Sequence, residues 1–207
     1  MVLRVRSLKR FIYLISPSKI YSNFYKDLEK VLSSKKVSFF QLRLKNIPKN
    51  LIIKVAKKIR IITKKNKVKF IINDDSKLAK KVNADGCHIG QLDNTVRLAR
   101  KNIRKKIIGV TCHNSKELAL KASEDMADYL AFGSFFKSKL KPKAKKANLK
   151  ILFWAKKNIK KPIVVIGGIN DKNYEKLIKA GANYIAISTF IWNNPFLKPE
   201  AAIKKFK

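Results

Sequence analysis

The amino-acid sequence predicts an α/β protein in which eight parallel strands close into a (β/α)8 TIM barrel. The main observation is that short apolar runs rich in Val, Ile, Leu and Phe recur eight times along the 207 residues. Such runs are typical of parallel strands that are covered on both faces. A second observation is that segments with helical spacing lie between these runs. The GxGxxG turn of the alternative fold, an open doubly wound sheet, does not occur in the chain. We therefore expect one barrel domain over residues 1–207.

The eight expected strands contain many β-branched and aromatic residues, which favour the extended conformation. They cover residues 10–16, 37–44, 68–73, 86–90, 106–112, 129–135, 162–168 and 184–188. No linker rich in Pro, Gly or Ser divides the chain, so nothing marks a second domain. Because 207 residues lie near the lower limit for this fold, the loops between the elements are expected to be short.

The helices are predicted from apolar stripes and from capping residues. Two stripes repeat at helical spacing, one made of Phe24, Leu28, Val31 and Leu32 and the other of Ile52, Val55, Ile59 and Ile62. Ser115 has the chemistry of an N-cap, and Gly181 is placed as a C′ residue that ends a helix. The helical pattern is weaker after residues 86–90 and at the C-terminus.

The chain is strongly basic, with 49 Lys and Arg against 13 Asp and Glu and a formal net charge of +36. Lysine pairs occur all along the sequence and not on one element, which favours a diffuse surface property over a dedicated nucleic-acid site. Cys87 and Cys112 lie inside apolar runs and are expected to be buried free thiols. The N-terminal apolar run is too short for a signal peptide or a membrane span. We therefore expect a cytoplasmic protein that does not bind a membrane.

Polar side chains gather where the expected strands end, which is where a barrel of this kind has its active site. In chain order they are Gln41, Arg43, Lys45, Asn73, Asp74, Asp75, Gln91, Asp93, Thr111, His113 and Ser188, and the glycines Gly167 and Gly168 also lie at a strand end. Asp74 and Asp93 follow adjacent strands, and their carboxylates suit one hard cation such as Mg²⁺. With Arg43 and Lys45 beside them, they form the pattern of a magnesium-bound diphosphate.

A second anion site is expected at the turn of Gly167 and Gly168, followed by a helix start and with Ser188 nearby. Other polar residues have simpler interpretations. Asp75 is expected to cap the helix that starts at Ser76, Asp85 to be a turn residue before Gly86, and His113 to be structural.

Eight short motifs resemble those of the family that contains the thiamine-phosphate synthases and the thiazole tautomerases. They are "YLIS" (13–16), "QLRLK" (41–45), "NDD" (73–75), "ADGCHIGQLD" (84–93), "IIGVTCH" (107–113), "ADYLAFGSFF" (127–136), "VVIGGI" (164–169) and "AGANYIAIS" (180–188). Together they span nearly the whole chain. The resemblance implies the barrel fold and the coupling of hydroxymethylpyrimidine diphosphate to a thiazole phosphate, which gives thiamine phosphate and diphosphate.

The resemblance also implies roles for individual residues. Those expected to bind the pyrimidine diphosphate are Gln41, Arg43, Lys45, Asn73 and Thr111, of which Arg43, Lys45 and Thr111, together with Lys141, are also expected to be catalytic. Asp74 and Asp93 are expected to ligate Mg²⁺. Those expected to bind the thiazole phosphate are Gly168, Ile187 and Ser188. The implied mechanism is dissociative and uses no protein nucleophile.

The loop after the sixth expected strand departs from the family pattern Gly-Pro-x-Phe-Pro-Thr-x-Thr-Lys. It reads "GSFFKSKLK", so Ser138 retains a hydroxyl and Lys141 retains the cation while both prolines are lost. We expect Ser138 and Lys141 to contact the substrate from this loop, and the additional Lys137 and Lys139 to be candidate anion contacts.

Two other functions compete with the synthase. A thiazole tautomerase of the same family would use His113 as acid or base and would not need the metal carboxylates. A basic nucleic-acid-binding protein on a decayed barrel would not need Asp74 either. The presence of Asn73, Asp74 and Asp93 favours the synthase. The sequence does not predict an oligomeric state.

Overall fold

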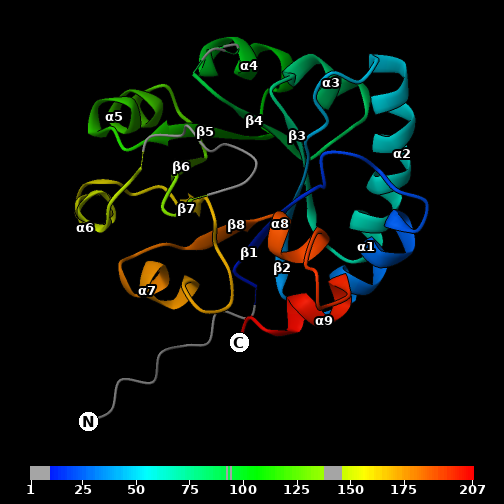
Figure 1. The fold of residues 1–207 in the computed structure, drawn as a ribbon. Helices are drawn as coiled ribbons and strands as arrows, with labels where there is room; N and C mark the ends of the chain where they lie inside the picture. The colour runs from blue at the N-terminus through cyan, green and yellow to red at the C-terminus, as the bar shows by residue number, and fades with distance from the viewer. Residues whose placement is uncertain (1–9, 92, 94, 138–145) are drawn as a thin grey trace.

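The computed structural model describes residues 10–91, 93, 95–137 and 146–207, in which eight parallel strands form a closed barrel (Figure 1). The strands are β1 (Ile12–Ile15), β2 (Val37–Leu42), β3 (Lys69–Asn73), β4 (Gly86–Ile89), β5 (Ile107–His113), β6 (Tyr129–Gly133), β7 (Ile163–Ile166) and β8 (Tyr184–Ile187). Each strand pairs with the next in the sequence, and β1 pairs with β8 to close the barrel. The eight predicted strands and the barrel fold are confirmed.

Helices surround the barrel on its outside (Figure 1). They are α1 (Phe24–Ser33), α2 (Lys49–Lys65), α3 (Ser76–Lys81), α4 (Val96–Ile103), α5 (Lys116–Glu124), α6 (Leu149–Asn158), α7 (Tyr174–Lys179), α8 (Thr189–Trp192) and α9 (Pro199–Lys204). The predicted stripe of α1 is fully buried, and in α2 Ile59 is buried while Ile52, Val55 and Ile62 are partly buried against the core.

The predicted helix ends are confirmed in three places. The Ser115 hydroxyl accepts a hydrogen bond of 3.1 Å from the Leu118 amide at the start of α5. The Asp75 carboxylate accepts one of 2.8 Å from the Leu78 amide at the start of α3, so its capping role is confirmed. Gly181 follows α7 with a φ of +115°, a conformation that favours glycine.

The core has two layers, because alternate side chains of each strand point inward and outward. The outward side chains pack against the helices and include Phe40, Phe70 and Phe132. The inward side chains fill the barrel and form a separate buried group of Tyr13, Ile15, Tyr129, Ala131, Val164 and Ala186. Cys87 and Cys112 are buried free thiols, as predicted, and burial raises the pKa of each to about 12.

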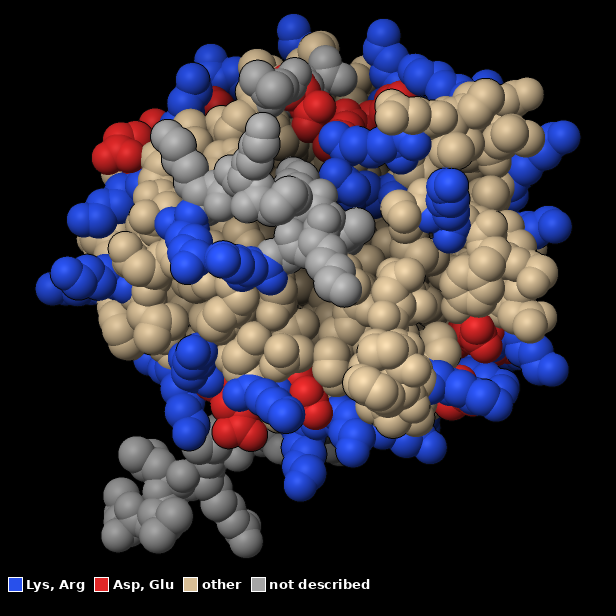
Figure 2. All heavy atoms as spheres, in the orientation of Figure 1, with Lys and Arg blue, Asp and Glu red and all other residues tan. Residues whose placement is uncertain are grey.

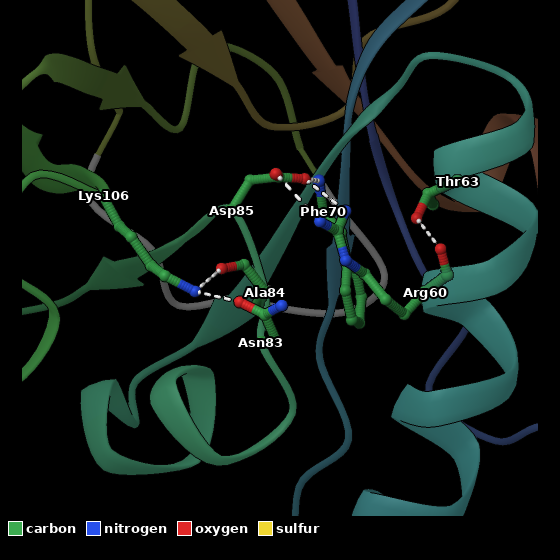
Figure 3. Close-up of polar contacts among 7 residues, drawn as sticks. All are labelled: Arg60, Thr63, Phe70, Asn83, Ala84, Asp85 and Lys106. Carbon is green, nitrogen blue, oxygen red and sulfur yellow. Dashed lines mark hydrogen bonds and ion pairs between the residues drawn. The ribbon is translucent and has the colours of Figure 1, made fainter.

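Asp85 joins two neighbouring strands at the amino-terminal end of the barrel (Figure 3). It lies at a bend before Gly86, as predicted, but its carboxylate also accepts a hydrogen bond of 2.7 Å from the Phe70 amide. Its own amide donates to the Phe70 carbonyl at 2.8 Å. The guanidinium of Arg60 on α2 pairs with the same carboxylate at 2.8 and 3.3 Å. Asp85 therefore fixes the register between β3 and β4.

The same connection recurs before β6 and β8. Asp128 accepts a 2.8 Å hydrogen bond from the Ile108 amide and pairs with Arg100 of α4 at 2.8 Å. Asn183 accepts one of 2.8 Å from the Ile163 amide through its side-chain oxygen. In each case the backbone amide of the polar residue donates back to the same strand residue, at 2.7 Å and 2.9 Å. The described barrel thus repeats one polar connection every two strands.

Lys and Arg side chains lie all around the edge of the molecule in Figure 2 and at several points within the visible face, so they are not confined to one element. This distribution agrees with the prediction that the charge is a diffuse surface property. Among the described residues, no helix is both long enough and apolar enough to cross a membrane.

Candidate active site

The predicted polar residues lie at the carboxyl ends of the strands, which the parallel arrangement brings to one mouth of the barrel. Gln41, Asn73, Thr111 and Ile187 belong to strands β2, β3, β5 and β8. Arg43, Lys45, Asp74, Asp93 and Ser188 follow strand ends or lie in the adjoining loops. The fold therefore gathers these residues around one site, as the sequence predicted.

Asp74 and Asp93 meet at the ends of β3 and β4. Their side chains interact electrostatically, and the Lys45 ammonium lies 3.5 Å from Asp74. Burial raises the pKa of Asp74, the interaction with Asp93 raises it further, and Lys45 lowers it. Asp93 also accepts a 2.6 Å hydrogen bond from the Gly90 amide. Two carboxyl groups in contact form a site that attracts a cation.

The backbone of Asp74 has a φ of +65°, a left-handed conformation that is uncommon for residues other than glycine, asparagine and aspartate. Its amide donates to the His88 carbonyl on β4 at 2.7 Å. The chain therefore turns sharply after Asn73, and the turn directs the Asp74 carboxyl group toward Asp93.

A hollow of about 250 Å³ is lined in part by Asp74. Lys45, Asn73, Asp74 and Lys49 contribute to its polar side, and Leu44, Ile52 and Leu78 are among its apolar residues. The Lys49 ammonium lies 3.2 Å from Asp75. Lys49 was not among the site residues predicted from the sequence, because it lies on a helix with several other exposed lysines. Figure 2 shows acidic side chains beside Lys and Arg in the upper part of the view, on the side of α3 and α4.

Gln41 and Arg43 have different environments at the end of β2. Gln41 is 3% exposed and points into the barrel, where its amide donates to the Tyr13 hydroxyl at 3.1 Å. The backbone of Arg43 is fixed by a 3.0 Å hydrogen bond from its amide to the Ser16 hydroxyl. Within the described part of the chain, the Arg43 guanidinium has no hydrogen-bond or ion-pair partner. The backbone of Arg43 is therefore fixed at the mouth of the barrel, and among the described residues nothing pairs with its positive charge.

A chain of polar side chains lies in the barrel beneath this mouth. The Tyr13 and Tyr129 hydroxyls are 2.7 Å apart, and the Tyr129 hydroxyl is 2.9 Å from Nδ1 of His88. Nε2 of His88 is 2.8 Å from the Thr111 hydroxyl. Thr111 was among the site residues predicted from the sequence, whereas Tyr13, His88 and Tyr129 were not. The sequence signal that could have identified these three residues is a polar side chain at an inward-facing position of an otherwise apolar strand.

The glycine turn after β7 is shaped by close packing. Gly168 has a φ of +62°, and a Cβ atom there would lie 2.4 Å from the Lys137 carbonyl oxygen. A helix follows the two glycines, as predicted, but α7 begins only at Tyr174. The intervening residues instead form a turn in which the Asn173 side chain donates to the Gly168 carbonyl at 3.0 Å.

Ser188 lies between β8 and the short helix α8. Its hydroxyl donates to the Ser16 carbonyl at 3.0 Å, and its carbonyl accepts from the Ile191 and Trp192 amides. Ile187 beside it is buried. Both residues are therefore firmly held next to the mouth.

Other predicted residues can be placed only in part. Ser138 and Lys141, and with them the question of loop closure, lie outside the described residues. His113 is exposed at the end of β5 with a φ of +53°. Across the described part of the chain, no group of three or more His, Cys, Asp or Glu side chains is arranged to hold a metal ion. A metal at this mouth therefore needs ligands from substrate or water beside Asp74 and Asp93.

A closed barrel with several polar and charged side chains gathered at the carboxyl ends of its strands is the architecture of a (β/α)8-barrel enzyme. The model of one family, described as thiamine monophosphate synthase, matches residues 12–191. The chain belongs to this family.

Known proteins similar to the chain agree with this assignment. The thiamine-phosphate synthase of Pelagibacter ubique (strain HTCC1062) is 56% identical over 200 residues, covering 96% of this chain and 97% of the relative. That of Erythrobacter litoralis (strain HTCC2594) is 39% identical over 200 residues, covering 94% and 92%. The structure of the thiamine phosphate pyrophosphorylase of Pyrococcus furiosus aligns with a TM-score of 0.85 at 27% identity, covering 95% of this chain and 93% of that one.

Proposed function

We propose that the chain couples hydroxymethylpyrimidine diphosphate to hydroxyethylthiazole phosphate and releases thiamine phosphate and diphosphate. Family membership and the relative of 56% identity support this activity. The structural observation that carries the proposal is the contact of Asp74 and Asp93 beside Lys45 at the mouth of the barrel. Two carboxylates and a cation at one point suit a diphosphate bound together with a divalent metal.

Asp74 and Asp93 fit Mg²⁺ by the chemistry of their oxygens. Their contact raises the pKa of Asp74, because two negative charges at this distance destabilise each other. A hard divalent cation bound by both carboxylates removes that repulsion. When bound, Mg²⁺ would supply positive charge that stabilises the diphosphate as it departs.

The cations and hydrogen-bond donors of the mouth would hold the pyrimidine diphosphate. Arg43 and Lys45 lie on the β2 side of the carboxylate pair, and Lys141 of the loop after β6 would add a third cation. Gln41, Asn73, Thr111 and Ser138 would contribute hydrogen bonds. The diphosphate carries only acceptor oxygens, so donors and cations are the groups that it requires.

The reaction breaks the bond between the pyrimidine methylene carbon and the diphosphate oxygen, and the electron pair leaves with the diphosphate. The methylene carbon becomes cationic, and the lone pair of the thiazole nitrogen forms the new carbon–nitrogen bond. Gly168, Ile187 and Ser188 would hold the thiazole phosphate so that its nitrogen faces this carbon. The protein then contributes positioning and electrostatic stabilisation of the leaving group.

Two further expectations belong to this proposal. Residues 1–207 form one barrel domain, and the enzyme acts on small molecules in the cytoplasm. The thiazole tautomerase is the less favoured activity, because isomerisation by proton transfer does not require the contact of Asp74 and Asp93.

The test is incubation of the purified protein with both phosphorylated substrates and Mg²⁺, with thiamine phosphate and diphosphate measured by chromatography. Omitting either substrate is the control, and both products should then be absent. A parallel incubation with a thiazole carboxylate phosphate tests the tautomerase. Isomerisation without any coupling would replace the proposed function by that alternative.

A further inference from the structure

Ser16 lies directly after β1, between two strands that lead to different parts of the mouth. The neighbours of β1 in the closed barrel are β2 on one side and β8 on the other. Ser16 is only 3% exposed, although its side chain is polar. Because buried polar groups are almost always hydrogen-bonded, the partners of Ser16 show which segments it holds.

The Ser16 hydroxyl holds the backbone of Arg43 just beyond the end of β2. It accepts a hydrogen bond of 3.0 Å from the Arg43 amide. Its own proton is shared between the Pro17 and Arg43 carbonyls, at 3.1 and 3.4 Å. The Ser16 amide donates to the Gln41 carbonyl at 2.9 Å, and a regular parallel ladder would continue with the Arg43 amide donating to the Ser16 carbonyl. The side chain of Ser16 thus takes the place of its carbonyl on the β2 side.

The Ser16 carbonyl is used on the β8 side instead. It accepts a hydrogen bond of 3.0 Å from the Ser188 hydroxyl. The preceding carbonyl, that of Ile15, accepts one of 2.6 Å from the indole of Trp192 on α8, which is 8% exposed. The Ile191 and Trp192 amides donate in turn to the Ser188 carbonyl, at 2.9 and 3.1 Å. The turn that carries Ser188 is therefore bound to the end of β1 by two side-chain hydrogen bonds.

We propose that Ser16 is a positioning residue that fixes Arg43 and Ser188 relative to each other. Its hydroxyl positions the backbone of Arg43, and its carbonyl positions Ser188. The inference rests on the proposed function, which places the pyrimidine diphosphate beside Arg43 and the thiazole phosphate beside Ser188. Coupling two substrates requires their reacting atoms to be held close and aligned, so a residue that connects both subsites contributes to the rate without touching either substrate.

Ser16→Ala tests the hydroxyl, because it removes the contact with Arg43 and keeps the carbonyl. Hydrogen exchange of the Arg43 amide, followed by NMR of the whole protein, should become roughly tenfold faster. The affinity for inorganic diphosphate in the presence of Mg²⁺, measured by calorimetry, should fall roughly fivefold, as expected for one lost hydrogen bond. Ser16→Thr retains the hydroxyl and should behave like the wild-type protein in both measurements.

Ser38→Ala is the matched control at the opposite end of the barrel. The Ser38 hydroxyl on β2 donates to the Arg10 carbonyl, just before β1, at 2.8 Å. Its loss should lower Tm but change neither the exchange of the Arg43 amide nor diphosphate binding. Equal effects of Ser16→Ala and Ser38→Ala on diphosphate binding, or no effect of Ser16→Ala on either measurement, would overturn the inference.

Kinetics separate the two contacts of Ser16. Ser16→Ala should raise KM for the pyrimidine diphosphate roughly fivefold and leave KM for the thiazole phosphate unchanged. Ser188→Ala removes the contact with the Ser16 carbonyl and should raise KM for the thiazole phosphate instead. An equal rise of both KM values in Ser16→Ala would contradict the assigned roles. If Ser16→Ala weakens diphosphate binding as expected but the wild-type protein forms no thiamine phosphate, the proposed function fails and the positioning of Arg43 by Ser16 remains.

Discussion

The carboxyl groups of Asp74 and Asp93 interact at the ends of adjacent strands, with the Lys45 ammonium 3.5 Å from Asp74. The left-handed backbone at Asp74 and the Gly90 amide that donates to Asp93 hold the two groups together. This contact is unfavourable without a cation, because burial and the neighbouring charge both raise the pKa of Asp74. The fold therefore places two carboxyl groups in an electrostatically unfavourable arrangement at the position where the proposed reaction needs Mg²⁺.

The stability of the metal-free protein should depend on pH through Asp74. Because the folded-state pKa is raised, the folded protein keeps a proton on this carboxyl over a range in which the unfolded chain has lost it. Stability therefore falls as the pH rises from the ordinary carboxyl value through the raised one. Asp74→Asn removes this loss and tolerates the left-handed backbone, so Tm at neutral pH should rise by about 2 °C.

Thermal unfolding with and without Mg²⁺ measures this effect. The wild-type protein should be stabilised by Mg²⁺, and Asp74→Asn should respond little. Asp75→Asn is the matched control, since asparagine also caps α3 and the metal response should persist. A lower Tm for metal-free Asp74→Asn than for the wild-type protein would contradict the pKa argument.

The connection at Asp85 predicts a graded loss of stability. Asp85→Ala leaves the Phe70 amide and Arg60 without their partner and should cost about 2 kcal/mol in the free energy of unfolding. Asp85→Asn should cost less, because Asn183 makes the equivalent connection with an amide oxygen. Denaturant unfolding measures both, and Arg97→Ala, which breaks an exposed ion pair, is the control. Equal costs for Asp85→Ala and Arg97→Ala would contradict the structural role.

A substitution at Gly168 should affect both stability and substrate binding. Gly168→Ala introduces a Cβ atom at a left-handed position against the Lys137 carbonyl, and it should cost about 2 kcal/mol in the free energy of unfolding. It should also raise KM for the thiazole phosphate, because the turn moves. Gly181→Ala is strained in the same way at the end of α7, and it should destabilise without raising that KM. If the two variants have the same KM, Gly168 does not contact the thiazole phosphate.

The lysines of the loop after β6 should differ in their contribution to turnover. Lys141 stands at the cation of the family motif, and Lys145 lies beyond it. Lys141→Ala should therefore lower kcat of thiamine phosphate formation far more than Lys145→Ala, because only the first removes a cation from the departing diphosphate. Steady-state kinetics measure kcat of thiamine phosphate formation for the two variants. Small and equal effects would mean that the loop provides no catalytic cation.

The sequence predicted the fold well because each strand and helix is marked locally. Apolar runs marked all eight strands, and Asp75, Ser115 and Gly181 marked three helix ends. The contact of Asp74 and Asp93 was predictable as well. Consecutive strands of a barrel are neighbours, so residues at their ends meet.

Interactions that depend on register and side-chain orientation were not predictable. Asp85 was expected only in a turn, since its pairing with Phe70 depends on how far β4 is shifted along β3. The chain from Gln41 to Thr111 depends on which strands face one another across the closed barrel. The exact start of α7 at Tyr174 was not predictable, because it depends on the turn that the Asn173 side chain completes by donating to the Gly168 carbonyl.

The central claim is that the carboxylate pair supports metal-assisted formation of thiamine phosphate, and one measurement tests it most directly. The rate of thiamine phosphate formation is followed as the Mg²⁺ concentration is varied, for the wild-type protein and for Asp74→Asn and Asp93→Asn. We predict that the wild-type rate rises with Mg²⁺ and saturates, and that both variants lose at least about 100-fold in rate at every Mg²⁺ concentration. A wild-type rate and Mg²⁺ dependence in Asp74→Asn would contradict the claim.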